Sequence, residues 1–144
     1  METPTATADI TRVYLVEDSP LIRDRLLDLL VEIEGVAIAG VADSEAPAIA
    51  EILRERPDTV VLDLRLAEGS GLNVLRAVHA QAPEIIFIVL TAFDSPQYRN
   101  TCINAGASHF FDKSSEIGQV RAVISARASA RRLLGSLQTD RQED

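Results

Sequence analysis

The stretch Thr59-Val60-Val61-Leu62-Asp63-Leu64 places a short run of strand-forming residues directly before an acidic side chain. Its apolar residues are continuous instead of alternating with polar ones, which is typical of a strand buried on both faces. Four similar runs flank this one along the chain, at Arg12–Val16, Val36–Val41, Ile85–Leu90 and His109–Asp112. We therefore expect five strands, with Thr59–Leu62 at the centre of a parallel sheet.

Helix-patterned segments separate these runs. Ser19-Pro20 and Ser95-Pro96 each offer an N-cap hydroxyl followed by a proline in the first turn. Strands that alternate with helices predict a doubly wound α/β fold, a five-stranded parallel sheet with helices on both faces. The helices are expected from Pro20 to about Ile33, from Ser44 to before Pro57, over Gly71–Gln81, from Pro96 to about Gly106, and from Ser115 to about Leu137.

Length and charge favour one acidic domain. The chain has 144 residues, 47% of them apolar, and a formal net charge of −8, which disfavours direct binding to nucleic acid or anionic membranes. Its longest apolar run, Ile85–Leu90, is far shorter than a membrane span, and its only cysteine excludes an internal disulfide. We expect a cytoplasmic domain over residues 11–137, a flexible N-terminus at 1–10 and a polar tail at 138–144.

Polar side chains follow four of the five expected strands. Glu17 and Asp18 follow the first, Asp63 the third, Thr91 the fourth and Lys113 the fifth. The carboxyl ends of parallel strands form one edge, where such sheets bind their ligands. Three converging carboxylates repel one another, and Mg²⁺ prefers such oxygen ligands. These residues predict a site for a phosphoryl group beside Mg²⁺, with Asp63 as the nucleophile.

Four segments, each containing one of these strand-end positions, resemble the receiver domain of two-component response regulators. The resemblance covers about Thr11 to Leu134 and implies the flavodoxin-like strand order 2-1-3-4-5. The segments are Leu15-Val16-Glu17-Asp18, Val60-Val61-Leu62-Asp63-Leu64 with Gly71 eight residues after the aspartate, Val89-Leu90-Thr91-Ala92, and Gly106-Ala107-Ser108-His109-Phe110-Phe111-Asp112-Lys113.

The resemblance assigns a role to each acidic residue. It implies that Asp63 accepts a phosphoryl group from a phosphohistidine on a histidine kinase or phosphotransfer protein. It also implies that Asp18, Asp63 and the backbone carbonyl of Arg65 bind Mg²⁺, or Mn²⁺ in its place, with Glu17 assisting through water.

The resemblance also implies a switch. Lys113 and Thr91 would contact the phosphoryl oxygens, and Phe110 would turn inward when Thr91 is drawn toward the phosphate. Such a chain is a phosphoacceptor with weak autophosphatase activity at most, not an enzyme. The family usually has a proline after the lysine, whereas Ser114 stands here. We therefore expect a trans peptide bond at this point.

Several functions remain open. The leading interpretation is a stand-alone receiver that signals to an unknown downstream protein. The sequence Lys113-Ser114 resembles the corresponding segment of regulators that carry a helix-turn-helix output domain. The alternative is therefore an N-terminal receiver fragment of such a transcriptional regulator. A Mg²⁺-dependent aspartyl-phosphate phosphatase usually needs a second aspartate where Arg65 stands. A flavodoxin-like cofactor binder is disfavoured because Glu17 and Asp18 would repel a phosphate in the absence of a metal.

The expected last helix carries two apolar stripes. One stripe is sufficient to dock it on the sheet, and the second continues past the expected end of the domain. This second stripe suggests a helix-mediated homodimer or a docked partner. The stripe that docks on the sheet consists of Ile117, Val120, Ile124 and Ala128. The second stripe consists of Val123, Ala126, Ala130, Leu133 and Leu137.

Overall fold

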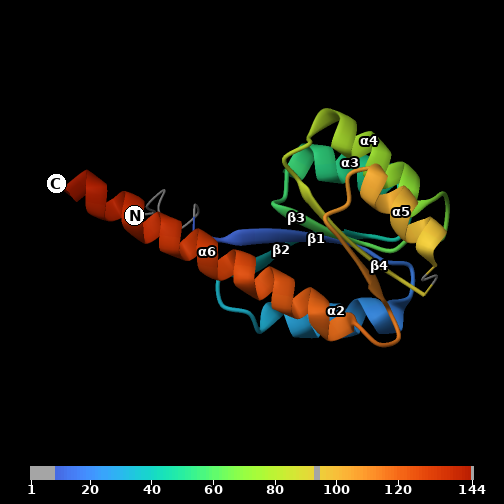
Figure 1. The fold of residues 1–144 in the computed structure, drawn as a ribbon, viewed down its shortest axis with the longest axis horizontal. Coiled ribbons are helices and arrows are strands. Elements are labelled where there is room, and N and C mark those ends of the chain that lie inside the picture. Colours follow the sequence, from blue (N-terminus) through green and yellow to red (C-terminus); the bar gives the residue numbers. More distant parts are fainter. Residues whose placement is uncertain (1–8, 93–94, 144) are drawn as a thin grey trace.

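The fold is a five-stranded parallel sheet with strand order β2-β1-β3-β4-β5, as the sequence predicts. A computed structural model describes residues 9–92 and 95–143. The polypeptide alternates between strand and helix throughout (Figure 1). In chain order the elements are β1 (Thr11–Val16), α2 (Pro20–Val31), β2 (Val36–Ala42), α3 (Glu45–Glu55), β3 (Thr59–Leu62), α4 (Gly71–Gln81), β4 (Ile86–Thr91), α5 (Pro96–Asn104), β5 (His109–Asp112) and α6 (Ile117–Glu143).

Helices cover both faces of the sheet. Figure 1 shows α3, α4 and α5 on one face and α2 with α6 on the other. Along β3, Val60 and Leu62 pack into the cluster under α3, α4 and α5, whereas Val61 packs into the cluster under α2 and α6. Successive side chains of a strand point to opposite faces. The continuous apolar run of β3 is therefore explained by two cores, one on each face.

Serine side chains cap three of the helices. Ser19 accepts a hydrogen bond from the amide of Ile22, and Ser95 and Ser70 cap α5 and α4 in the same way. Ser44, directly before α3, makes no capping bond; its hydroxyl donates to the Asp43 carboxylate, at 2.8 Å.

Helix α6 is longer than expected. Its first stripe docks as predicted, with Val120, Ile124 and Ala128 at most 1% exposed. Its backbone stays helical to Glu143, through most of the segment expected to be a polar tail, and its last turns project past the sheet (Figure 1). Residues 1–8 of the expected flexible N-terminus, and Asp144, lie outside the described part. Within that part no helix is long and apolar enough to cross a membrane.

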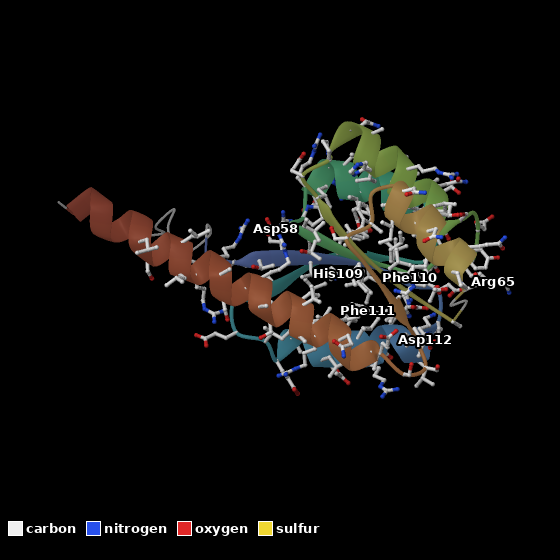
Figure 2. The ribbon with its side chains drawn as sticks, viewed as in Figure 1. Asp58, Arg65, His109, Phe110, Phe111 and Asp112 are labelled. Carbon is white, nitrogen blue, oxygen red and sulfur yellow. The ribbon has the colours of Figure 1, made fainter. Side chains whose placement is uncertain are left out.

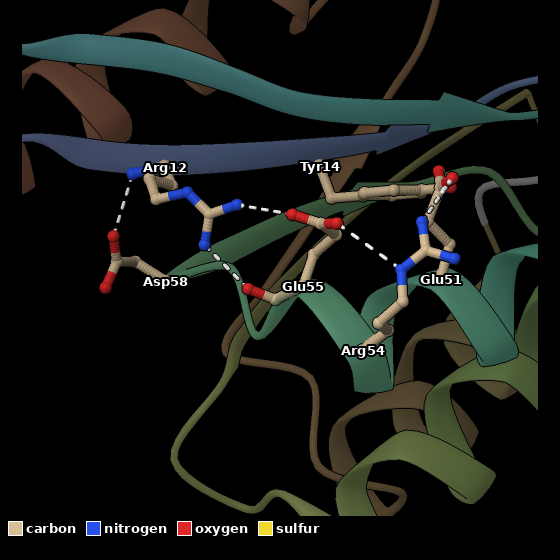
Figure 3. A network of polar contacts seen from close by, with 6 residues as sticks. All are labelled: Arg12, Tyr14, Glu51, Arg54, Glu55 and Asp58. Carbon is tan, nitrogen blue, oxygen red and sulfur yellow. Dashed lines mark hydrogen bonds and ion pairs between the residues drawn. The ribbon is translucent and has the colours of Figure 1, made fainter.

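A polar network at the amino ends of the strands ties β1 to α3. The Arg12 guanidinium donates to the backbone carbonyl of Glu55, at 2.6 Å, and to its carboxylate, at 2.9 Å (Figure 3). The hydroxyl of Tyr14 donates to Glu51, and burial together with this contact raises the pKa of Tyr14. Asp58 accepts from the Arg12 amide and from Arg131 of α6, both at 2.7 Å. This network stands at the end of the sheet opposite the predicted site.

Candidate functional site

Strand register brings the acidic residues together. Val16 of β1 lies beside Leu62 of β3, and the amide of Asp63 donates to the Val16 carbonyl, at 3.0 Å. Glu17 and Asp63, one residue past each strand, therefore leave the sheet at the same level. The oxygen atoms of Glu17, Asp18 and Asp63 lie within 4.8 Å of one another. The predicted carboxylate cluster is present at the carboxyl edge.

Lys113 bridges the two buried carboxylates of this cluster. Thr91 of β4 lies beside Asp112 of β5, and the Lys113 amide donates to the Thr91 carbonyl, at 2.9 Å. This pairing places Lys113 at the same carboxyl edge of the sheet as the acidic residues. Its Nζ lies 2.8 Å from Asp63 Oδ2 and 2.9 Å from Glu17 Oε2. One ammonium group thus serves two carboxylates that are 4% and 2% exposed.

The local charge is unbalanced. Burial raises the pKa of Glu17 to about 7, and the nearby Asp63 carboxylate adds to this effect, while the hydrogen bonds from Lys113 and Ser19 lower it. Burial alone would lower the pKa of Lys113, but its hydrogen bonds to Asp63 and Glu17 outweigh this and raise it. With all groups ionised, the three carboxylates of this cluster carry three negative charges and Lys113 carries one positive charge.

The donor set fits a hard divalent cation. All three side chains offer carboxylate oxygens, which Mg²⁺ prefers, and the excess negative charge matches its two positive charges. Asp18 is exposed, so water can complete a coordination shell from that side. The amide of Arg65 lies 3.4 Å from Asp63 Oδ1, and the Arg65 side chain is exposed. The predicted use of the Arg65 carbonyl stays a prediction.

Gly71 makes room for the backbone of Asp63. A Cβ atom at position 71 would overlap the carbonyl oxygen of Asp63, so only glycine fits. The same close approach lets the Gly71 amide donate to the Leu64 carbonyl, at 2.9 Å. The sequence motif included Gly71, but the reason for it is visible only in three dimensions. Gly71 thus supports the turn that presents the Asp63 side chain.

The loop after β3 is anchored to the segment before α3. The Ala67 amide donates to the Asp43 carbonyl and the Glu45 amide to the Glu68 carbonyl, both at 2.9 Å. A proline at position 67 could not donate this bond, because it has no amide hydrogen. The carboxylate of Glu45 also accepts from the Ser70 amide, at 2.9 Å. These contacts hold the loop that follows the acidic residue.

Phe110 is already buried in this structure. It is 3% exposed and belongs to the core cluster under α3, α4 and α5, and Thr91 is fully buried. The Arg99 guanidinium of α5 lies over the Phe110 ring, 4.9 Å from its centroid, and donates to the Phe110 carbonyl, at 3.3 Å. Arg99 was not predicted, because nothing in its local sequence indicates a distant aromatic partner. The inward turn of Phe110 on phosphorylation stays a prediction.

A compact turn carries Lys113 from β5 into α6. The Ser114 amide and hydroxyl both donate to the Asp112 carboxylate, which lowers the pKa of Asp112. Glu116 accepts from the Asp112 amide, at 2.9 Å. The Lys113–Ser114 peptide is trans, as expected for a non-proline residue. Figure 2 shows Asp112 and Arg65 near the carboxyl edge and Asp58 at the far end of the sheet.

Comparisons with known proteins agree with this geometry. The family model of the response regulator receiver domain matches residues 13–125. The DNA-binding transcriptional activator DevR/DosR of Mycobacterium tuberculosis is 31% identical over 131 residues, which are 84% of this chain and 60% of that protein. Protein-glutamate methylesterase/protein-glutamine glutaminase 1 of Syntrophus aciditrophicus is 33% identical over 106 residues, 72% of this chain and 30% of that enzyme.

A solved structure extends the likeness to three dimensions. The two-component response regulator of the LuxR family from Aurantimonas sp. SI85-9A1 superposes with a TM-score of 0.77 at 26% identity, over 85% of this chain and 88% of that one. The two curated relatives are longer than this chain, which spans 60% of one and 30% of the other.

Proposed function

Since this chain belongs to the family of response regulator receiver domains, we propose that it is a phosphorylation switch whose acceptor is Asp63. The proposal rests on one observation above all. Lys113 bonds the buried Asp63 within an acidic cluster whose negative charge exceeds the single positive charge that Lys113 supplies. An arrangement that is electrostatically incomplete by itself suits a site that receives a cation and a phosphoryl group.

The proposed reaction is the transfer of a phosphoryl group from a phosphohistidine of a histidine kinase or phosphotransfer protein. An Asp63 carboxylate oxygen forms the new O–P bond, the N–P bond of the donor breaks, and the imidazole leaves with its electron pair and takes up a proton from solvent. Lys113 stays beside the acceptor, where its ammonium group offsets charge on the phosphoryl oxygens. Thr91 supplies a hydroxyl that donates to one of these oxygens. The proposed setting is the cytoplasm.

We assign the metal ligands to the same cluster. Asp18, Asp63 and the Arg65 carbonyl would hold Mg²⁺, or Mn²⁺ in its place, with Glu17 acting through water. When bound, the ion neutralises phosphoryl oxygens. Glu17 also positions Lys113, because the two side chains are bonded at 2.9 Å.

The output is proposed to be a change in protein contacts. Phosphorylation adds about −1.5 to −2 charges and three acceptor oxygens at one point. Movement of Thr91 toward them would change the space beside Phe110. Arg99, which contacts Phe110 through its ring and its carbonyl, would carry that change to the surface of α5.

A second candidate is the receiver part of a DNA-binding regulator. The relative DevR/DosR is described as a DNA-binding transcriptional activator, and this chain spans 60% of its length. In that case the change at α5 would act on a DNA-binding module instead of a separate protein. Both candidates share the same phosphoacceptor chemistry.

Intact-protein mass spectrometry after incubation with acetyl phosphate and Mg²⁺ tests the proposal. We expect one added phosphoryl group on the natural chain and none on Asp63→Asn or when Mg²⁺ is chelated. Asp28→Asn is the matched control, since Asp28 is exposed on α2; it should be phosphorylated normally. A phosphoryl adduct that persists in Asp63→Asn, or forms equally without a divalent cation, contradicts the assignment.

A further inference from the structure

The outer face of α6 carries an apolar seam. Ala126, Ala130, Leu133 and Leu137 follow the 4-3-4 spacing of a heptad seam. With about 100° of rotation per residue, this seam lies nearly opposite the stripe that packs on the sheet. Both alanines are exposed, and Leu133 and Leu137 are 64% and 49% exposed. The seam is therefore a surface and not part of the core.

We propose that two copies of this chain associate through this seam, with their α6 helices antiparallel and the two-fold axis passing between residues 131 and 132. In this register Leu137 faces the partner's Ala126, and Leu133 faces the partner's Ala130. The two-fold axis repeats both contacts, which gives four layers that each combine one large and one small residue. Facing large and small residues interdigitate well. The seam is thus complementary to itself, as an isologous interface requires.

The charges beside the seam favour the same orientation. Arg127 is the only charged residue among the positions that flank the seam, which are otherwise Ser129, Leu134 and Ser136. In the antiparallel register the two copies of Arg127 are nine residues apart along the axis, or about 14 Å. This exceeds the Debye length of about 8 Å at physiological ionic strength, so their repulsion is largely screened.

A parallel pair is less favourable. It would place Ala126 and Ala130 opposite their own counterparts, and the leucines opposite theirs. The helices would then have to approach closely at one end and separate at the other. The two Arg127 side chains would also stand at the same level of the pair. The antiparallel register avoids both problems.

Contacts on the other side of α6 hold the seam in place. Arg131 donates to the Ile10 carbonyl, at 3.0 Å, and to Asp58, at 2.7 Å, and Arg132 donates to the Glu34 carbonyl. These bonds fix the helix to the body in the region of the proposed axis. A surface that is already ordered loses little conformational freedom on association. The proposal does not depend on phosphorylation.

Sedimentation equilibrium of the whole chain, from micromolar to millimolar concentration, tests the association. We expect a reversible dimer. Leu133→Glu should raise its dissociation constant about a hundredfold or more, because the two-fold axis removes two leucines at once. Val31→Glu, at a residue of α2 that is 62% exposed, is the matched control and should leave the constant unchanged. A strict monomer throughout, or a dimer that tolerates Leu133→Glu, overturns the proposal.

Spin labels test the orientation. A nitroxide on Ala122→Cys should report backbone positions about 28 Å apart along the axis in the antiparallel pair, since the register separates them by nineteen residues. A parallel pair would bring them to about 10 Å, the usual distance between packed helices. The natural chain, whose Cys102 is 1% exposed, serves as the labelling control. The shorter distance overturns the proposed register.

Discussion

Replacing Glu17 by glutamine should stabilise the metal-free protein at alkaline pH. Glu17 is buried, and this burial raises the pKa of its carboxyl to about 7, from an ordinary value of 4.5. Between these values the folded chain keeps a proton that the unfolded chain has lost. Stability therefore falls as the pH rises through this range and stays low above it. At pH 8 the raised pKa of Glu17 lowers the free energy of unfolding by about 3 kcal/mol, because each pKa unit corresponds to 1.36 kcal/mol.

Glutamine removes this cost and keeps the shape and the acceptor oxygen that Lys113 uses. Urea unfolding followed by circular dichroism, with a chelator present, should show Glu17→Gln about 3 kcal/mol more stable than the natural chain at pH 8. The difference should shrink to about 1 kcal/mol at pH 5, where the unfolded chain is still partly protonated. Glu84→Gln, at a side chain that is 68% exposed, is the control and should change little.

The opposite behaviour is expected with Mg²⁺. A ligand that binds only the folded state raises its stability, and weaker binding raises it less. Mg²⁺ should therefore stabilise the natural chain more than Glu17→Gln. The reasoning is refuted if Glu17→Gln is less stable than the natural chain at pH 8, or if the difference between them does not vary with pH.

Substitutions at three further positions test the packing and capping of the helices. Gly71→Ala should lower the free energy of unfolding by more than about 2 kcal/mol, because the new Cβ overlaps the Asp63 carbonyl; unchanged urea denaturation would contradict this. Ile124→Ala should cost about 2–5 kcal/mol in the same assay, since Ile124 of α6 is fully buried in the core between this helix and the sheet. A loss below about 1 kcal/mol would mean that α6 is not docked as described. Ser70→Ala removes two accepted amide bonds and should cost about 1 kcal/mol, whereas Ser70→Gly should cost only a few tenths; equal losses in thermal unfolding would exclude capping as the cause.

Most elements could be predicted because their signals are local. The expected strand Thr59–Leu62 and the helix Gly71–Gln81 agree with the structure at both ends. The end of α6 was placed too early, because polarity after Leu137 was interpreted as a tail although those residues remain helical to Glu143. Polar residues are compatible with an exposed helix, so composition cannot mark where such a helix stops.

The meeting of Glu17, Asp63 and Lys113 could also be anticipated from the sequence. Each residue directly follows a strand, and a parallel sheet brings the ends of its strands to one edge. That inference needs only the strand positions and the direction of the chain. The number of residues between the strands does not matter for it.

The contacts between side chains were decided by the tertiary structure. Arg99 over Phe110, Arg131 on Asp58, and the Asp63 backbone against Gly71 join residues that no local pattern relates. Their partners depend on how helices pack on the sheet, to within about an ångström. Strand and helix periods specify which face a residue occupies, but not which neighbour it meets there. The sequence therefore predicts the edge where the chemistry takes place, and only packing shows how each group on it is held.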